Sequence, residues 1–291
     1  MEAIEQLRLY FAPLRTRQGI LARKALGEPA ADDDVLTRDL LQRMEGDFRA
    51  DGSFAGGVVG MVWRAHELLD LTAANEPQFA RIMSWLLDLQ SKPGSFSEGC
   101  TPARHSYRAC EHFISGFFSP APPEQRIAPL MLPNGKVFRA EPAARFAVSC
   151  LALRAALRAG LAERQAIDRH VVSLIHLQKQ APEKNGYFAP DVIIAAVHAL
   201  AYVTGPRCQY VPQLAGLLAQ KQSTEGPEKA DLFHTIEALV AIGTPEAGGI
   251  LRQLMPSLLA RRRADGSFGS TAQQERSLIA LRALIWMEQK V

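Results

Sequence analysis

The sequence predicts an all-α protein whose six helix-pair repeats close into an α6–α6 toroid, also called an α/α barrel. Apolar residues recur at spacings of three and four along most of the chain, and no long segment alternates with period two. Glycine-centred turns recur about every forty residues, a period typical of helical repeats. Strands are therefore not expected.

Each turn places a glycine where one helix ends, usually with an aromatic residue shortly after it. An Asp or Asn before the glycine can bond the local backbone, and we expect Phe268 to pack between repeats. Arg261, Arg262 and Arg263 suit the end of a helix, where positive charge favours the dipole. The six glycines are Gly52, Gly94, Gly135, Gly186, Gly226 and Gly266.

Each turn is expected to join a charged outer helix to an Ala-rich inner helix. We expect residues 1–291 to form a single domain, with a helical extension over 1–34 packed on a toroid of residues 35–291. Asp32, Asp33 and Asp34 suit the N-terminus of the first outer helix. The inner helices are predicted within residues 61–71, 105–117, 144–157, 192–203, 232–242 and 277–287.

The composition excludes several classes of protein. A net charge of +3 requires no polyanionic partner, so nucleic-acid binding is not expected. The four cysteines form no CxxC pair, which argues against a zinc ribbon and indicates reduced thiols in a cytoplasm. We expect neither a signal peptide nor a transmembrane segment.

Three inner-helix stretches occur in this order along the predicted repeats, the last two of them in adjacent repeats: "PARHSYRACEHF", "APDVIIAAVHAL" and "ADLFHTIEALVAIG". Together with the Gly-Ser-Phe turns, they resemble the terpene cyclase and protein prenyltransferase superfamily, and most closely the β subunits of protein prenyltransferases. The resemblance covers nearly the whole chain after about residue 35. It places Arg104 and Tyr107 on the family's Arg and Tyr, and Asp191 and His234 on its metal-ligand Asp and His.

The sequence also departs from the family at the residues that carry its chemistry. Ile193 stands where the family has a zinc-ligand Cys, and the chain has no DxDD motif. Zinc or magnesium therefore lacks a complete ligand set, and the cofactor stays open. Asp231 could join Asp191 and His234 in a different metal site, or Asp191 and His234 could act as an acid/base pair.

The remaining candidates are residues that could bind a ligand. Arginines can hold a diphosphate or carboxylate, and aromatic side chains can line a cavity for an isoprenoid. The alternatives are an internal salt-bridge network and aromatic rings that fill the toroid. The ligand-binding candidates are Trp63, Arg64, Arg104, His105, Tyr107, Arg108, Arg145, Phe146 and Phe233.

The resemblance implies a toroid that binds an isoprenoid, or another apolar ligand with an anionic head, and acts as an isoprenoid transferase or cyclase. Two alternatives stay open. One is a catalytically inactive binding or assembly module with a protein partner, as the family's β subunits have. The other is a toroidal enzyme of another class, such as a carbohydrate-active one, which paired carboxylates at one mouth would favour.

Overall fold

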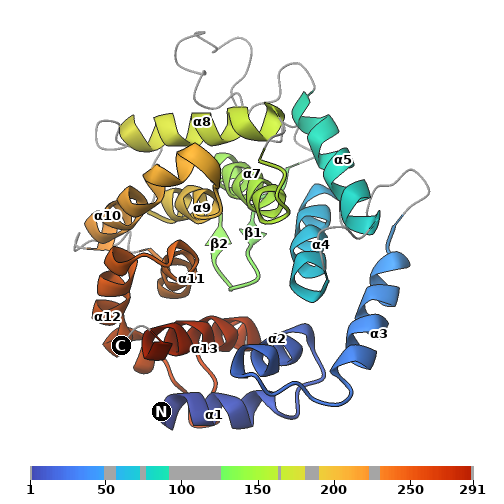
Figure 1. Cartoon of the computed structure of the whole chain (residues 1–291), viewed down its shortest axis with the longest axis vertical. Helices are drawn as coiled ribbons and strands as arrows, with labels where there is room; N and C mark the ends of the chain where they lie inside the picture. The colour runs from blue at the N-terminus through green and yellow to red at the C-terminus, as the bar shows by residue number, and fades with distance from the viewer. Residues whose placement is uncertain are drawn as a thin grey trace.

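The structure is a computed structural model that describes residues 2–48, 57–72, 77–91, 126–162, 165–180, 190–222 and 230–289. Its regular elements are almost all α-helices, which confirms the all-α prediction. Figure 1 shows these helices arranged around a central space in an inner and an outer set. Within the described ranges, no helix combines the length and hydrophobicity that a membrane crossing requires.

The inner helices form a closed circle of contacts (Figure 1). Each contacts the next, and the last of them, α13, contacts α2, which in turn contacts α4. These helices are α2 (Arg17–Leu26), α4 (Gly57–Leu71), α7 (Glu141–Arg158), α9 (Pro190–Leu200), α11 (Leu232–Ile242) and α13 (Gln273–Gln289).

The outer helices surround this circle, and each packs on at least one inner helix. A 3₁₀ helix, η4 (Gly205–Tyr210), leads into one of them, α10. The outer helices are α1 (Glu2–Phe11), α3 (Asp33–Glu45), α5 (Pro77–Ser91), α8 (Gln165–Gln180), α10 (Val211–Gln222) and α12 (Pro245–Leu259).

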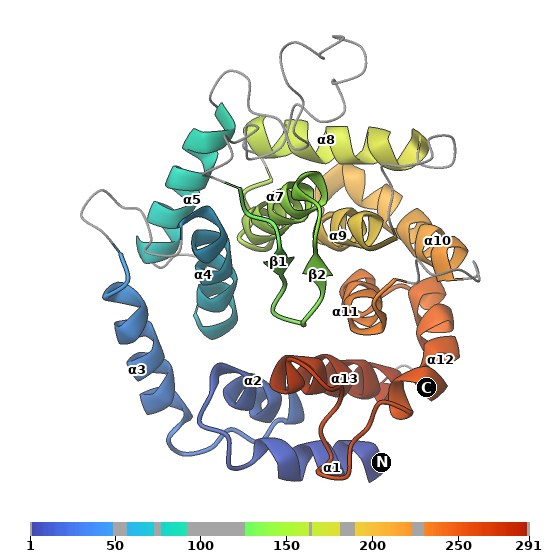
Figure 2. The ribbon, with the colours of Figure 1, turned by 180° about the vertical axis from the view of Figure 1, so that it is seen from behind.

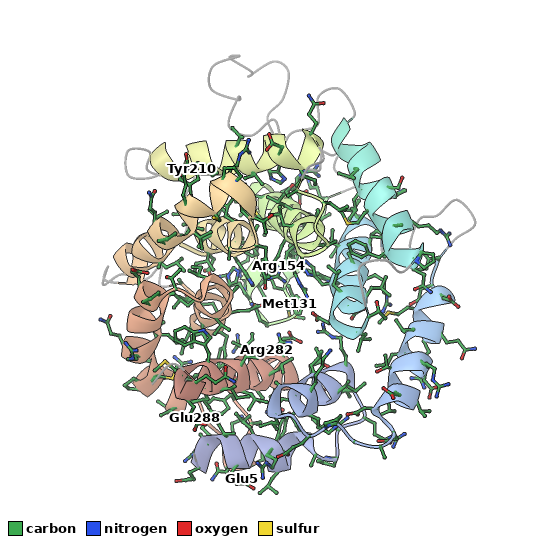
Figure 3. The ribbon with its side chains drawn as sticks, viewed as in Figure 1. Glu5, Met131, Arg154, Tyr210, Arg282 and Glu288 are labelled. Carbon is green, nitrogen blue, oxygen red and sulfur yellow. The ribbon has the colours of Figure 1, made fainter. Side chains whose placement is uncertain are left out.

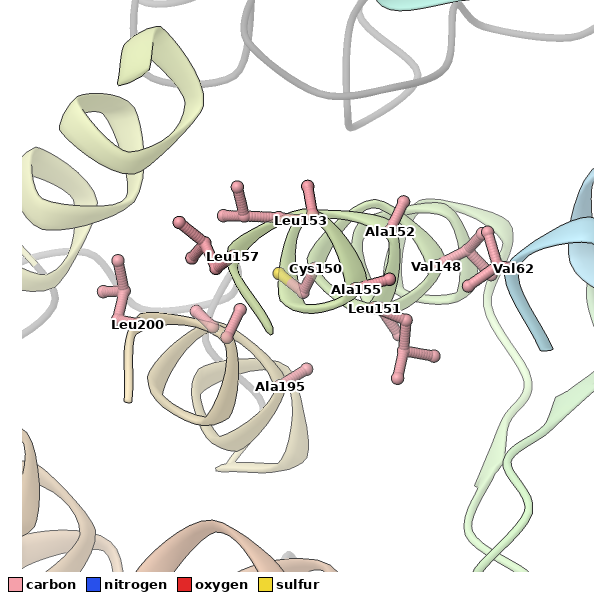
Figure 4. Close-up of a cluster of buried hydrophobic side chains, with 14 of the residues drawn as sticks. Val62, Val148, Cys150, Leu151, Ala152, Leu153, Ala155, Leu157, Ala195 and Leu200 are labelled. Atoms are coloured by element: carbon pink, nitrogen blue, oxygen red, sulfur yellow. The ribbon is translucent and has the colours of Figure 1, made fainter. Parts of the chain in front are cut away.

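Small side chains allow the inner helices to approach one another closely. Ala152 and Ala155 of α7 are fully buried, as is Ala196 of α9, and these two helices contact each other along their lengths. Figure 4 shows side chains of α7 packed beside Ala195 and Leu200 of α9. Burial of this Ala-rich face is what makes α7 and α9 inner helices, since an alanine adds little width between two backbones.

The N-terminal residues are placed differently from the predicted extension. Helix α2 lies in the inner set between α13 and α4, while α1 packs against α2 and α13 from outside. Ile20, Leu21 and Ala22 are buried, so α2 has an apolar face to pack. The Arg23 guanidinium anchors the helix, because it contacts the Asp33 carboxylate and the carbonyls of Phe11 and Leu14.

The prediction that the chain lacks strands is wrong at one place. Residues 130–138 form an antiparallel hairpin, β1 (Leu130–Met131) with β2 (Val137–Phe138), in the register Leu130↔Phe138 and Met131↔Val137. Gly135 is the turn glycine of this hairpin, at φ +83°, instead of a turn between two helices. Each strand has only two residues, which is too short to give a period-two pattern.

The hairpin extends from the inner helices into the central space. Figure 2 shows the molecule from behind, where the hairpin lies in front. Asn134 shapes its turn, because the side-chain oxygen accepts a hydrogen bond from the Lys136 amide at 3.1 Å. The Gly135 amide also donates to the Leu132 carbonyl at 2.9 Å.

The turn at Gly266 joins α12 to α13 as predicted. Gly266 has φ +81°, and the Asp265 carboxylate accepts from the Ser267 amide at 3.0 Å. Phe268 is fully buried in one cluster with Phe11 and Phe233, which confirms its packing role. The other predicted turns, at Gly52, Gly94, Gly186 and Gly226, lie outside the described residues.

We predict that Gly266→Ala destabilises the protein by about 1–3 kcal/mol, because a Cβ there requires a strained positive φ. That Cβ would also lie 3.0 Å from the Gln6 carbonyl oxygen of α1. Denaturant unfolding followed by circular dichroism measures the change. Gly46→Ala is the matched control, since Gly46 has φ −64° and is exposed. An equal effect of both substitutions would contradict this account of the turn.

Candidate functional site in the central cavity

A cavity of about 670 Å³ lies at the centre of the inner helices. This volume is within the ~300–1,000 Å³ range of small-molecule sites. Its walls combine apolar side chains from several inner helices and the hairpin with ionisable groups. The ionisable side chains in its lining are Arg17, His66, Glu67, Asp70, Arg154, Arg158, His198, Tyr202, His234, Glu237, Glu275 and Arg282.

Two helix N-termini bring Asp191 and His234 together. Asp191 lies in the first turn of α9 and His234 in the first turn of α11, and these helices are neighbours. The His234 Nδ1 atom is 3.4 Å from the Asp191 Oδ1 atom. His234 lines the cavity, whereas Asp191 is buried, so the carboxylate can orient the imidazole.

Asp191 is held in its ionised form. Burial favours the neutral acid, but hydrogen bonds from His234 and Lys136 outweigh it and lower the pKa of Asp191 below its usual value. The Asp231 amide adds a third donor, at 3.0 Å from Asp191 Oδ1. A negative charge that is fixed in this way can accept a hydrogen bond from His234 Nδ1 and so orient the imidazole.

Asp231 is the N-cap of α11. Its Oδ1 atom accepts from the amides of Phe233 and His234, at 3.0 and 3.1 Å. Its Oδ2 atom accepts from the Arg276 guanidinium of α13 at 3.2 Å. Asp231 therefore fixes the start of the helix that carries His234, and it is not part of the cavity lining.

The tip of the hairpin joins the same group of residues. The Lys136 ammonium forms an ion pair with Asp191. Asn134 accepts a hydrogen bond on its carbonyl from Arg276 Nε at 2.8 Å, and its side-chain amide donates to Glu237 at 3.1 Å. The hairpin is thus bonded to the N-termini of α9 and α13 and to a cavity-lining glutamate of α11.

Helix α7 places two arginines on one side of the cavity, four residues apart. Arg154 donates to the His198 Nδ1 atom at 2.7 Å and lies 3.4 Å from Glu237. Arg158 donates to the His66 Nδ1 atom at 3.2 Å and to Asp70 at 2.7 Å. Each guanidinium thus contacts one imidazole and one carboxylate from neighbouring inner helices.

Burial is the largest cause that lowers the pKa of His66 and His198 well below 6.5, and the charges of Arg154 and Arg158 lower it further. Both imidazoles are therefore neutral near pH 7. In His66 the Nε2 atom lies 2.9 Å from the Leu151 carbonyl, so the proton is assigned to Nε2 and Nδ1 accepts from Arg158.

Arg17 bridges α4 and α13 at the point where α2 closes the inner circle. Its guanidinium contacts Asp70 at 2.5 Å and Glu275 at 2.8 Å. Burial raises the pKa of Asp70, but the charges of Arg158 and Arg17 outweigh that and hold it below its usual value. Asp70 is consequently a carboxylate shared by two arginines.

Arg282 of α13 differs from these three arginines. No carboxylate in the described part of the chain forms an ion pair with it, although its charge also acts on Asp70. Figure 3 shows Arg282 and Arg154 reaching into the central space from α13 and α7, with Met131 of the hairpin between them in this view. Arg282 is therefore available to pair with an anion in the cavity.

The structure does not bring the predicted ligand-binding residues together in one site. Trp63 lines the cavity, whereas Arg64 pairs with Asp47 and Glu67 at 2.8 and 2.6 Å. Arg145 is buried beside Glu141, at 3.5 Å.

Neither predicted phenylalanine lines the cavity. Phe146 and Phe233 are buried in the core, and the Arg276 guanidinium lies 4.8 Å from the Phe233 ring centre. The candidates Arg104, His105, Tyr107 and Arg108 lie outside the described residues.

None of the four arginines that line the cavity is among the residues predicted from the sequence to bind a ligand; they are Arg17, Arg154, Arg158 and Arg282. A signal for two of them exists, because Arg154 and Arg158 interrupt the otherwise apolar stretch "ALRAALR" at a spacing that puts both on one helix face. Arg17 gave no such signal, since nothing in its local sequence places α2 in the inner set.

The described residues do not fit the zinc that the family resemblance implies. Ile193, at the position of the missing Cys ligand, is buried and has no donor atom. Asp191 is already bonded to Lys136 and to the Asp231 amide. Across the described ranges, no group of three His, Cys, Asp or Glu side chains could hold a metal ion.

Comparison of the chain with protein-family models and with curated proteins gives no match.

We predict that the free energy of unfolding falls by about 4 kcal/mol between pH 7.5 and 5.5. The buried His66, His170 and His198 stay neutral when folded, with the pKa of His170 lowered by burial to about 3. The unfolded chain protonates them below about pH 6.5, so each contributes about 1.4 kcal/mol of destabilisation. Denaturant titrations at both pH values test this, and His170→Gln should remove about a third of the difference. A free energy independent of pH would contradict the neutral assignment.

We predict that Lys136→Met increases hydrogen exchange of the hairpin amides about tenfold, because it removes a charge-assisted bond to a buried carboxylate. Exchange at Leu132 and Gly135, whose amides bond within the turn, is the measurement. Lys136→Arg should restore protection. Lys24→Met, on the exposed side of α2, is the control for loss of a surface lysine. Unchanged exchange in Lys136→Met would show that the ion pair does not hold the hairpin.

Proposed function

We propose that the protein is an α6–α6 toroid of the prenyltransferase and terpene-cyclase type. In this proposal its central cavity binds an amphipathic small molecule with an anionic head and an apolar part such as an isoprenoid chain. The observation that carries the proposal is Arg282, a cavity-lining guanidinium that pairs with no carboxylate among the described residues. A ligand phosphate or carboxylate would give it the partner that the other cavity arginines already have.

The surroundings of Arg282 support an amphipathic ligand. Arg154, Arg158 and Arg17 are already paired with carboxylates of the lining, so Arg282 is the cavity arginine whose charge a ligand anion would balance. Apolar side chains such as Trp63, Leu151 and Ile279 form the other part of the lining. A cavity with both kinds of wall suits a ligand that has a charged end and an apolar end.

His234 is the group that could move a proton in such a ligand. It lines the cavity, and the ionised Asp191 carboxylate faces its Nδ1 atom. With the proton of the neutral imidazole on Nδ1, the Nε2 atom is left to accept a proton from a bound molecule. This arrangement supports transferase or cyclase chemistry in which His234 acts as the base.

A second candidate is a binding module without catalysis. It is favoured by the buried Ile193 at the position of the missing zinc ligand and by the ion pair that engages Asp191 with Lys136. For a carbohydrate-active enzyme, which needs a protonated acid, Asp70 is unsuited, because its pKa is lowered by Arg158 and Arg17 against the effect of burial.

We predict that Arg282→Gln weakens binding of farnesyl diphosphate by about 10–100-fold, since it removes charge-assisted hydrogen bonds to the head group. Isothermal titration calorimetry with farnesyl diphosphate, inorganic pyrophosphate and farnesol measures this, and farnesol binding should be unchanged. Arg252→Gln, on the exposed face of α12, is the matched control. If wild type and Arg282→Gln bind farnesyl diphosphate equally well, and also bind pyrophosphate equally well, the head-group assignment is refuted.

Product analysis then separates the two candidate functions. Turnover of bound farnesyl diphosphate that is lost in His234→Gln, with binding retained, would support the transferase or cyclase. Binding without turnover in the wild type would support the binding module.

A further inference from the structure

Met131 is a large apolar side chain that remains exposed although it lies in the cavity wall. It is 63% exposed, whereas Leu130 and Leu132 on either side of it are each 4% exposed. The alternation of the strand buries its neighbours and turns Met131 the other way. Since Met131 lines the cavity, this exposed surface faces the space that a ligand would occupy.

The hairpin holds Met131 in a fixed position, because both its base and its tip are bonded to helices. At the base, the Glu141 carboxylate accepts from the amides of Ile127 and Ala128, at 3.0 and 2.8 Å. At the tip, Lys136 pairs with Asp191 and the Asn134 carbonyl accepts from Arg276. An exposed methionine on a mobile loop would be unremarkable, but this one is presented by a supported element.

The hairpin also contacts the candidate base directly. The Phe138 ring packs edge-on to the His234 imidazole, with ring centroids 6.4 Å apart. Phe138 pairs with Leu130 on the buried face of the hairpin, whereas Met131 pairs with Val137 on the other face. Met131 and His234 both line the cavity, so a ligand that covers Met131 occupies the space that His234 faces, and Arg282 lines the same cavity from α13.

We propose that Met131 is a specificity-determining residue that forms the apolar wall against which the tail of the ligand packs. The inference rests on the proposed function for the nature of the ligand and assigns a residue to the tail that is separate from the head-group arginine. A methionine suits this role, because its unbranched thioether adapts to irregular apolar shapes. The apolar surface that it exposes in the free protein is the surface that binding would remove from water.

Head-only and tail-only probes test the assignment with isothermal titration calorimetry. We expect Met131→Ala to weaken binding of farnesol and farnesyl diphosphate about tenfold and to leave binding of inorganic pyrophosphate unchanged. Met131→Leu, which keeps the apolar volume, should bind farnesol as the wild type does. Leu9→Ala is the matched control, since Leu9 is 66% exposed on α1 outside the cavity.

A spectroscopic measurement identifies Met131 as the contacting residue. With methyl-labelled methionine, we expect farnesol to shift the Met131 signal, which is assigned by its loss in Met131→Leu. Unchanged farnesol affinity in Met131→Ala, or a Met131 methyl signal that does not shift, would overturn the proposal. Failure of wild type to bind farnesol would overturn it as well.

The test of Arg282 as the head-group residue is independent of the test of Met131. If pyrophosphate does not bind and Arg282→Gln has no effect, the anionic head is refuted while a Met131-dependent affinity for farnesol would still stand. If Arg282→Gln weakens pyrophosphate binding and Met131→Ala has no effect on farnesol, the head-group site stands and the Met131 assignment falls.

Discussion

Three of the four arginines that line the central cavity are paired with carboxylates of other helices, and these ion pairs determine how the inner helices meet. A buried guanidinium without a partner costs several kcal/mol, far more than a surface ion pair contributes. Arg154 and Arg158 therefore contact groups on α4, α9 and α11, and Arg17 contacts α4 and α13. Each pair fixes the rotation of one helix relative to another, so the central charges orient the walls of the cavity.

The hairpin depends on the same principle at one mouth of the cavity. Its two short strands could not be stable alone, since an isolated hairpin of this size has little to bury. The ion pair from Lys136 to Asp191 and the Arg276 bond to Asn134 tie its tip to the N-termini of α9 and α13. These bonds also hold Asp191 beside His234, so the support of the hairpin and the orientation of the candidate base share the same residues.

The juxtaposition of Asp191 and His234 could be anticipated, because both lie in the first turn of neighbouring Ala-rich helices and such N-termini meet at one end of the inner set. The role of Asp231 as a helix cap was also open to local reasoning, since Asp before a helix accepts from the backbone. Arg145 and Phe233 show the limit of that reasoning. Their positions in sequence resemble those of cavity residues, yet both are buried away from the cavity by contacts made with Glu141 and Arg276.

Periodicity and glycine spacing were enough to predict the helical class, most inner helices and the turn at Gly266, because these depend on contacts within a few residues or on a repeated pattern. Tertiary packing alone decided that α2 completes the inner circle, that residues 130–138 form a hairpin, and which arginines face the cavity. Those outcomes depend on partners distant along the chain, such as Arg17 with Glu275 and Lys136 with Asp191. A charge gives no local sign of which distant group neutralises it, so only the folded chain distinguishes a paired arginine from one left to bind a ligand.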